Sequence, residues 1–565
     1  MEKRNLFKGF WTLFKSYWSS EEKWKARGLL AFVIALNLAM VWFLVQINTW
    51  YNDFYNALQE YQAESFWPLV GQFTGLAFCY IIIAVYAIYL RQLLEIRWRT
   101  WMTKNYLNAW MAGQTYYHLQ GGTDNPDQRI SEDINSFVSL TLQLIIGFLR
   151  QLTTLAAFSV VLWELSGEFK LNFGGTEIII YGYMFWFSLI YSGVGTFLVH
   201  KVGRKLIGLE FDQQKYEADF RFSMMRVREN AESIAFYRGE NAELEGFSAR
   251  FKNVIENFRR LMTKTKHLNF YINGYGQLAI IVPLILAAPR YFSKEIQLGG
   301  LMQTISAFGR VQDALSYFVD SYGTIANLAA VINRLSGFTE HVEEVQKVKS
   351  RVEKSAAAEL TISDLNISLP TGRELLNKLS LSLENSKSLL VTGASGCGKS
   401  TLLRTLAGIW AYAQGKISLP QNSKVMFLPQ KPYLPLGTLR RALVYPAAEK
   451  DAPPDEKLIE TLKIVDLPNL TDKLDVADDW TRILSGGEQQ RLAFARVLLT
   501  APNYIFLDEA TSALDEPREL EMYKLLKEKL PAVTIISVGH RSTLFEVHDT
   551  ELRLDGAGNW SVKEI

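Results

Sequence analysis

Eight consecutive residues in the second half of the chain could bind phosphate. They fit the pattern G-x-x-x-x-G-K-[ST] and are Gly393, Ala394, Ser395, Gly396, Cys397, Gly398, Lys399 and Ser400. In loops of this pattern the backbone N–H groups and the lysine surround the phosphates of a nucleotide. The apolar run 389–391 predicts a strand before the loop, and Thr401 opens a stretch that predicts a helix after it. This order directs a helix N-terminus at the anion. A chance glycine-rich turn is the alternative, and residues farther along the chain argue against it.

Polar residues that could serve the same nucleotide follow three more predicted strands. They are Gln430, the pair Asp508 and Glu509, and His540. Mg²⁺ needs hard oxygen ligands beside the phosphates, which Ser400, Asp508 and Gln430 can supply. Glu509 is placed to polarise the attacking water, and His540 can hydrogen-bond the γ-phosphate region. Each residue alone would usually be structural, but the ordered set predicts a site that hydrolyses a nucleotide.

A second anion-binding surface is predicted at residues 484–488. Ser485, Gly486, Gly487 and Glu488 open a helix, so a hydroxyl and bare glycine backbone lie at a helix N-terminus. One chain needs only one such surface for its own nucleotide. We therefore expect this one, followed by a short loop that ends at Asp515, to serve the nucleotide of a partner chain.

These elements require an α/β domain from about residue 359 to 565, because strand and helix patterns alternate there. Residues 340–358 carry mixed charges and then Ser-Ala-Ala-Ala, with no apolar face of any size, so they predict an interdomain linker.

The composition of the whole chain favours a membrane protein. Hydrophobic residues make up 48% of the whole sequence and charged residues 21%, both near the edge of the range of soluble proteins. The net charge of +2 gives no reason to expect nucleic acid as a partner. Two cysteines, Cys79 and Cys397, cannot build a disulfide framework or a thiolate metal site.

About six membrane-spanning helices are predicted between residues 29 and 339. The apolar stretches are 29–47, 67–90, 140–163, 178–199, 268–289 and 297–330. Most have close to the ~20 residues that cross a bilayer, although the ends of the last are uncertain. Aromatic residues at helical spacing in 1–28 predict an amphipathic helix on the membrane surface. The alternative is a helix packed on a protein core.

Basic residues predict the orientation of these spans. Segments 1–28, 91–139 and 200–267 are rich in Lys and Arg, whereas 48–66 has none. By the positive-inside rule both termini are then cytoplasmic. Charged residues inside spans usually face protein or a water-filled cavity. Four candidates for a polar translocation path are Arg150, Arg310, Asp313 and Asp320, with structural pairing or a misplaced span boundary as the alternatives.

The ordered motifs resemble the nucleotide-binding domain of ABC transporters. In that family's terms they are Walker A 393–400, the Q-loop Gln430, the signature 484–488, Walker B 504–508, the catalytic Glu509, the D-loop 512–515 and the H-loop His540. The membrane half resembles the SbmA/BacA-type domain in three segments: 125–130, 52–55 and 232–239. The whole chain is similar to bacterial fused proteins of the YddA type, and also to the peroxisomal subfamily D half-transporters.

This resemblance implies an exporter-like α-helical transmembrane domain followed by an α/β P-loop ATPase domain. The protein would be a multi-pass half-transporter of the inner membrane, surrounded by membrane lipid, that binds ATP and Mg²⁺ and works as a homodimer. Residues 123–134 and 229–239 would be cytoplasmic loops that dock on the ATPase domains. The SbmA/BacA likeness implies import of a peptide or bulky hydrophilic solute, and the subfamily D likeness implies acyl-CoA or fatty acids. A membrane-anchored regulatory ATPase without transport is the rival from another class.

One departure from the family concerns adenine. ABC domains usually have an aromatic residue about 25 positions before Walker A that stacks on the base, as the resemblance implies. No aromatic residue occurs between 355 and 392, and Leu369 stands near the expected position. The sequence thus predicts modest ATP affinity and weak discrimination against GTP, unless Trp410 or a residue of the partner chain covers the base.

Overall fold

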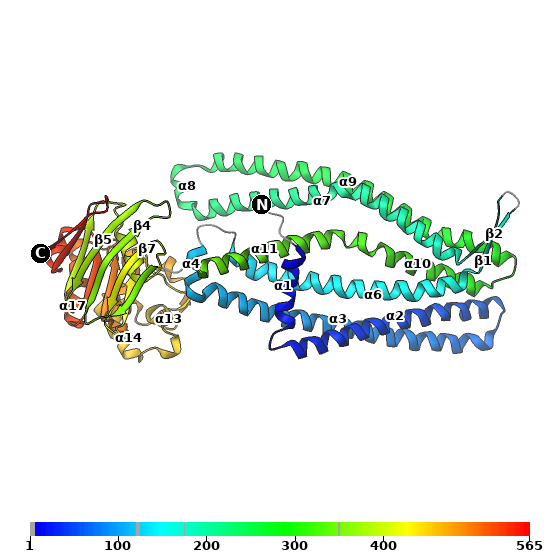
Figure 1. The fold of residues 1–565 in the computed structure, drawn as a ribbon, viewed down its shortest axis with the longest axis horizontal. Coiled ribbons are helices and arrows are strands. Elements are labelled where there is room, and N and C mark those ends of the chain that lie inside the picture. The colour runs from blue at the N-terminus through cyan, green and yellow to red at the C-terminus, as the bar shows by residue number, and fades with distance from the viewer. Residues whose placement is uncertain (1–5, 120–124, 174–175, 348–350) are drawn as a thin grey trace. The chain divides into compact units, whose positions relative to one another are not determined.

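The computed structural model describes residues 6–119, 125–173, 176–347 and 351–565 (Figure 1). The chain forms two compact units. Unit 1 comprises Met1–Ala112 and Leu119–Val342, and unit 2 comprises Gly113–His118 and Glu343–Ile565. Each unit is built around its own core.

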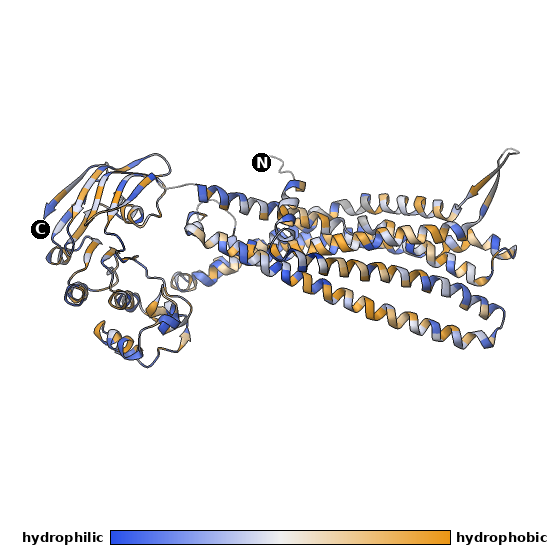
Figure 2. Cartoon of the chain, turned by 60° about the horizontal axis from the view of Figure 1, so that its bottom comes forward, coloured by the Kyte–Doolittle hydropathy of each residue, from blue (hydrophilic) through white to orange (hydrophobic). Residues whose placement is uncertain are grey.

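Unit 1 is a bundle of long helices. Its helices are α1 (Leu6–Trp18), α2 (Lys23–Gln59), α3 (Ala63–Met111), α5 (Pro126–Gln128), α6 (Ile134–Ser166), α7 (Tyr183–Glu229), α8 (Ala231–Tyr237), α9 (Glu240–Phe292), α10 (Leu298–Asp320) and α11 (Tyr322–Lys347). Apolar residues run along α2, α3, α6 and α9 (Figure 2). Within the described residues, these four helices have the length and composition to cross a membrane, and α7 has a shorter apolar stretch, Tyr183–Val199.

Two of the predicted spans have different limits in the structure. The stretch 178–199 begins as the strand β2 (Thr176–Tyr181), which pairs with β1 (Glu168–Phe173) as an antiparallel hairpin, and the helix starts at Tyr183. The run Ile-Ile-Ile-Tyr fits a strand as well as a helix, because a short apolar run has no periodicity that separates them. The stretch 297–330 is divided between α10 and α11 at Ser321.

Helix α1 packs on unit 1 through its aromatic residues. Trp98 of α3 is fully buried and contacts Phe14, Tyr17 and Trp18, with the ring of Tyr17 stacked on it at 5.5 Å. Phe7 and Trp11 stay exposed. One side of the amphipathic helix α1 therefore packs on a protein core. The sequence analysis left this possibility open as the alternative to a helix on the membrane surface. The predicted range 1–28 also includes the start of α2.

Residues 125–134 form a short helical segment that is anchored by ion pairs. Asp133 accepts from Arg334 of α11 through both carboxylate oxygens, at 2.6 and 2.9 Å, and from Arg129 at 2.5 Å. Arg129 and Asp133 are buried. The segment is thus part of the packed bundle of unit 1. Residues 123 and 124 of the predicted docking loop lie outside the described residues.

Unit 2 contains two larger sheets. The six-stranded sheet has the order β14 (Trp560–Glu564), β13 (Thr550–Leu554), β6 (Ser388–Gly393), β12 (Thr534–Val538), β11 (Tyr504–Asp508) and β8 (Val425–Leu428). All neighbours are parallel except β14. The four-stranded sheet has the order β3 (Arg351–Ala356), β7 (Ala413–Leu419), β4 (Leu360–Ser368) and β5 (Glu374–Leu383).

Helix α4 (Thr115–His118) belongs to unit 2 but precedes these strands in the chain. The helices between the strands are α12 (Lys399–Ala407), α13 (Leu439–Val444), α14 (Asp455–Ile464), α15 (Trp480–Ile483), α16 (Gly486–Thr500) and α17 (Glu516–Lys529). A two-stranded sheet pairs β9 (Gly437–Thr438) with β10 (Ala477–Asp478). The predicted linker 340–358 holds the end of α11 and strand β3. Because β3 is an edge strand with mostly exposed side chains, it lacks the apolar alternation that marks a strand.

Candidate nucleotide-binding site

The parallel strands β6, β12, β11 and β8 end at one edge of the six-stranded sheet. Ligands of such sheets bind beyond the carboxyl ends of the strands. The predicted residues lie there because each ends or follows one of these strands. The phosphate loop follows β6, His540 follows β12, Asp508 ends β11 with Glu509 directly after it, and Gln430 follows β8.

The phosphate loop has a backbone that only glycine tolerates at its start. Gly393 has φ 136°, and a Cβ atom there would lie 2.3 Å from the carbonyl oxygen of Leu554. Lys399 opens α12, and its Nζ donates to the carbonyls of Gly393 at 2.8 Å and Ala394 at 3.1 Å. The side chain of Lys399 therefore folds back over the phosphate loop. Its positive charge lies at the N-terminus of α12, where anions bind.

The two strongest metal-ligand candidates contact each other. Ser400 Oγ donates to Asp508 Oδ1 at 2.9 Å, although 108 residues separate them. A hydroxyl and a carboxylate are the hard oxygen donors that Mg²⁺ takes beside nucleotide phosphates. The described residues contain no group of three His, Cys, Asp or Glu side chains that could hold a metal alone. This donor set therefore fits a metal that is shared with a phosphate ligand.

Glu509 is held in an unusual backbone conformation. Its φ is 47°, a left-handed value that non-glycine residues seldom adopt. Its N–H donates to Val538 O of β12 at 3.2 Å, and its carboxylate accepts from Gln430 Nε2 at 3.1 Å. Such backbone strain concentrates at functional sites. The sequence predicted Gln430 as a metal ligand. In the structure its side-chain amide nitrogen donates to the Glu509 carboxylate.

His540 stands beyond the end of β12 with an exposed side chain. The preceding Gly539 donates its N–H to Val391 O of β6 at 3.3 Å, which holds this turn beside the phosphate loop's strand. A Cβ atom on Gly539 would come within 2.2 Å of Leu544 Cδ1, so any larger residue here would have to displace the Leu544 side chain.

The second anion surface has a fully formed helix cap. Ser485 is the N-cap of α16: its Oγ donates to Glu488 Oε2 at 2.8 Å, and the N–H of Ser485 donates to the same oxygen at 2.9 Å. These two hydrogen bonds hold the pKa of the Glu488 carboxyl below its usual value. Glu488 therefore orients Ser485. This role explains why a carboxylate is present at a surface that is predicted to bind anions. Asp515, in turn, caps α17 by accepting from Arg518 N.

Gln490 joins three of these motifs, and the sequence analysis gave it no role. Its Nε2 donates to Gln430 O at 3.0 Å and to Ser512 Oγ at 3.2 Å, and its Oε1 accepts from Ala513 N at 2.9 Å. The side chain is 2% exposed. Buried glutamines are uncommon. In the sequence, only its position two residues after Glu488 of the signature indicated that Gln490 could belong to the site.

Arg541 makes a similar connection from the residue after His540. Its guanidinium donates to Leu514 O at 2.7 Å and to Ser512 O at 3.3 Å, and it lies 3.6 Å from the buried carboxylate of Glu519. The loop 512–515 is thus fixed from both sides, by Gln490 and by Arg541.

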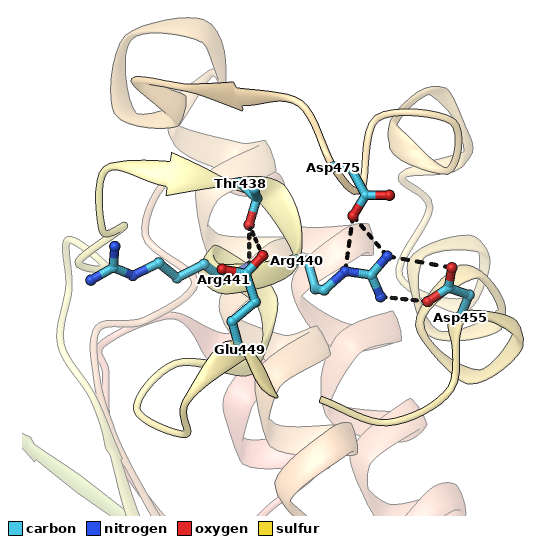
Figure 3. A network of polar contacts seen from close by, with 6 residues as sticks. All are labelled: Thr438, Arg440, Arg441, Glu449, Asp455 and Asp475. Carbon is cyan, nitrogen blue, oxygen red and sulfur yellow. Dashed lines mark hydrogen bonds and ion pairs between the residues drawn. The ribbon is translucent and has the colours of Figure 1, made fainter. Parts of the chain in front are cut away.

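An ion-pair network holds the segment before the signature against the segment after Gln430 (Figure 3). Arg440 pairs with Asp455 and, at 2.8 Å, with Asp475, and both carboxylates raise the pKa of Arg440. Trp480 Nε1 donates to Gly437 O at 3.2 Å beside this network. The carboxylates are exposed, so the ion pairs are worth little energy, and the buried Trp480 dominates this contact.

Aromatic side chains lie near the predicted adenine position. Leu369 follows β4 and packs against the core of the four-stranded sheet. Trp410 Nε1 donates to Ser368 O at 3.0 Å, and Tyr412, which contacts the ring of Trp410, is 51% exposed. The segment after α12 therefore places two aromatic side chains near Leu369, and they are candidates for the base contact.

Comparison with known proteins agrees with this geometry. Residues 13–292 match the family described as ABC transporter transmembrane region 2, and residues 376–512 match the family described as ABC transporter. The chain belongs to the ABC transporter family. This transporter is 36% identical to the inner membrane ABC transporter ATP-binding protein YddA of Escherichia coli, over 97% of each chain. It is 34% identical to the chloroplastic ABC transporter D family member 2 of Arabidopsis thaliana, over 100% of this chain and 89% of the relative.

The transporter also shares its fold with a solved structure. A bacterial Atm1-family ABC exporter with ATP bound superposes with a TM-score of 0.74 over 94% of each chain, at 17% identity. An exporter-type helical region followed by an α/β ATPase domain is therefore the correct fold class, as the sequence predicts.

Proposed function

We propose that this half-transporter works as a homodimer in the inner membrane, with both termini in the cytoplasm, and couples ATP hydrolysis to inward movement of a bulky hydrophilic solute or peptide. One observation carries the ATPase assignment: Asp508, which accepts a hydrogen bond from Ser400, is followed directly by Glu509, which accepts one from Gln430. A metal-ligand candidate and a candidate base thus lie together at the end of β11.

The chain's own groups have separate parts in hydrolysis. The backbone N–H groups of 394–400 and Lys399 Nζ bind the phosphates, and Lys399 exchanges its two loop carbonyls for phosphate oxygens. Ser400 and Asp508 would hold Mg²⁺, which neutralises charge on the phosphates. Glu509 accepts the proton of the attacking water. Gln430 restrains the Glu509 carboxylate through its 3.1 Å hydrogen bond.

The second anion surface supports a site made by two chains. α16 presents Ser485 and two glycines at its N-terminus, whereas the phosphate loop at α12 already provides for the chain's own nucleotide. In the homodimer, each nucleotide then lies between the phosphate loop of one chain and Ser485 of its partner.

Polar residues in the helices of unit 1 support a hydrophilic solute. Arg150, Arg310 and Asp313 line a cavity of about 160 Å³ together with apolar side chains. Intramembrane charges are costly and mark substrate paths. An acyl-CoA type of substrate, export, and a regulatory ATPase that moves nothing are the competing functions.

Mixed dimers test the two-chain site. Ser485→Arg fills the anion surface and Lys399→Ala removes the phosphate lysine, so each homodimer should fail to trap nucleotide. A heterodimer of the two has one composite site with both motifs intact, and we expect nucleotide trapped on the Ser485→Arg chain. No trapping in the isolated heterodimer would contradict the shared site.

Transport itself is tested in sealed vesicles. A candidate peptide should stimulate ATP hydrolysis and accumulate with the inward orientation, and Glu509→Gln should abolish both. Hydrolysis with nucleotide-dependent partner binding but without flux would favour the regulatory ATPase.

A further inference from the structure

A second cavity in unit 1 lies among four helices and contains two arginines. It has a volume of about 300 Å³. Arg91 of α3 and Arg150 of α6 line it, with Asn37 of α2, Gln143 of α6 and Ser321 as further polar residues. No Asp or Glu is among its lining residues. The cavity therefore has a positive potential that nothing in its own wall neutralises.

Neither arginine has an acidic partner within the described part of the chain. The ion pairs there do not include Arg91 or Arg150. Arg91 Nε is also buried and has no hydrogen-bond acceptor. A buried donor on a charged group costs free energy unless an acceptor satisfies it. A fork of guanidinium donors matches the oxygens of a phosphate, which can accept from two donors at once.

The surroundings of the cavity point to a lipid. Its other lining residues include Val33, Ala84, Ala87 and Ile88, which are apolar. Ile88 is 54% exposed, and its neighbours Val85 and Tyr89 are each 59% exposed, so the same part of α3 presents an apolar surface. An exposed apolar face on a membrane helix contacts acyl chains. A phosphate group in this cavity would thus have its hydrocarbon chains beside α3.

We propose that this cavity binds the phosphate headgroup of an anionic membrane phospholipid through Arg91 and Arg150. Basic pockets between membrane helices on the cytoplasmic side bind such headgroups. Arg91 directly follows the span predicted to end at residue 90 on that side, so the predicted orientation places the Arg91 end of the cavity at the surface of the inner leaflet. From there the cavity extends to Arg150, inside the span predicted at 140–163. Arg150 also lines the smaller cavity with Arg310 and Asp313, whereas Arg91 does not, so the proposal adds a lipid ligand to the proposed function.

Binding is measured with the full-length protein in a neutral detergent. Short-chain phosphatidylglycerol is the probe, and phosphatidylcholine with the same chains is the zwitterionic control. We expect saturable binding of phosphatidylglycerol that weakens with salt, because the contact is an ion pair. Arg91→Gln and Arg150→Gln should each weaken it by at least about tenfold, or about 1.4 kcal/mol. Arg91→Lys keeps the charge but loses the fork, and should lie between wild type and Arg91→Gln.

Arg97→Gln is the matched control, since Arg97 is an exposed arginine of the same helix outside the cavity. It should leave phosphatidylglycerol binding unchanged. ATP hydrolysis in phosphatidylcholine nanodiscs should persist in Arg91→Gln, which shows that the variant is folded. If Arg91→Gln does not fold, the Arg91→Lys affinity and the salt dependence of the wild type still decide.

Three results would overturn the proposal. Equal affinity for phosphatidylglycerol and phosphatidylcholine would show that the net charge of the headgroup does not contribute to binding. Equal weakening by Arg97→Gln would show that a general surface charge attracts the lipid. Competition by inorganic phosphate as strong as that by phosphatidylglycerol would assign the cavity to a soluble anion, because the acyl chains would then contribute nothing.

Discussion

Gln490→Leu is expected to reduce ATP turnover without removing any group that touches the nucleotide. The substitution keeps a similar volume and removes three hydrogen bonds, to Gln430 O, Ser512 Oγ and Ala513 N. Gln430 is the residue that restrains the Glu509 carboxylate. When its backbone loses the anchor, the candidate base loses its fixed position.

The magnitude follows from these contacts. At about 0.5–1.5 kcal/mol for each hydrogen bond, three bonds contribute about 2–4 kcal/mol to the free energy of unfolding. A displacement of about 1 Å at the reacting groups costs about 100-fold in rate. We therefore expect a moderate loss of thermal stability and a fall in kcat of roughly 100-fold, with a smaller change in the affinity for ATP because the phosphate loop is untouched.

Gln489→Leu provides the control. Gln489 is also buried, and its Nε2 donates to Thr481 O at 2.9 Å and Leu484 O at 2.8 Å, but it contacts neither Gln430 nor the loop 512–515. Steady-state ATPase assays and thermal unfolding of both variants separate the two effects. An equal fall in kcat for Gln489→Leu, or wild-type turnover in Gln490→Leu, would refute the positioning role.

Three further outcomes are expected. Glu509→Gln should bind ATP normally but hardly hydrolyse it, because the amide keeps the shape and cannot act as the base; wild-type turnover in this variant would contradict the assignment. Burial lowers the pKa of His548 to about 4, so acidification from about pH 6.5 towards 4 protonates the unfolded state first and destabilises the folded protein, by up to about 3 kcal/mol. Replacing His548 with Gln should remove that slope from unfolding curves measured across this window. Leu369→Tyr should tighten ATP binding by roughly 5- to 150-fold with little change in kcat; no gain, together with weaker binding by Tyr412→Ala, would assign the base contact to Tyr412.

The sequence was sufficient for the fold class because both halves carry strong local signals. Long apolar stretches predict membrane helices, and a glycine loop between a strand and a helix predicts the start of the ATPase sheet. The motif residues lie at one sheet edge because their strands are parallel, so the order of motifs already implies their convergence.

Other features had no local signal. Strand β3 is recognised only by its ladder with β7, and the hairpin of β1 and β2 begins an apolar run that also fits a helix. Gln490 and Arg541 act through backbone carbonyls and amides that are distant in sequence, from Gln430 to Leu514. A side chain can bond to a backbone group of any residue type. No pair of residue types in the sequence therefore indicates such a contact.

The contacts of Gln490 connect the chain's two anion surfaces. Ser485 is the N-cap of α16, and Gln490 is the fifth residue of the same helix. A force on the cap of a helix shifts the whole helix, because its backbone hydrogen bonds make it rigid along its axis. In the proposed homodimer, a partner's nucleotide that binds Ser485 would therefore act on the loop 512–515 and on Gln430 through Gln490. Gln430 in turn donates to Glu509, the candidate base beside the chain's own nucleotide. Gln490 thus connects the two nucleotide sites of the proposed homodimer through one helix and a few hydrogen bonds. ATP bound at one site would then influence the position of Glu509 at the other.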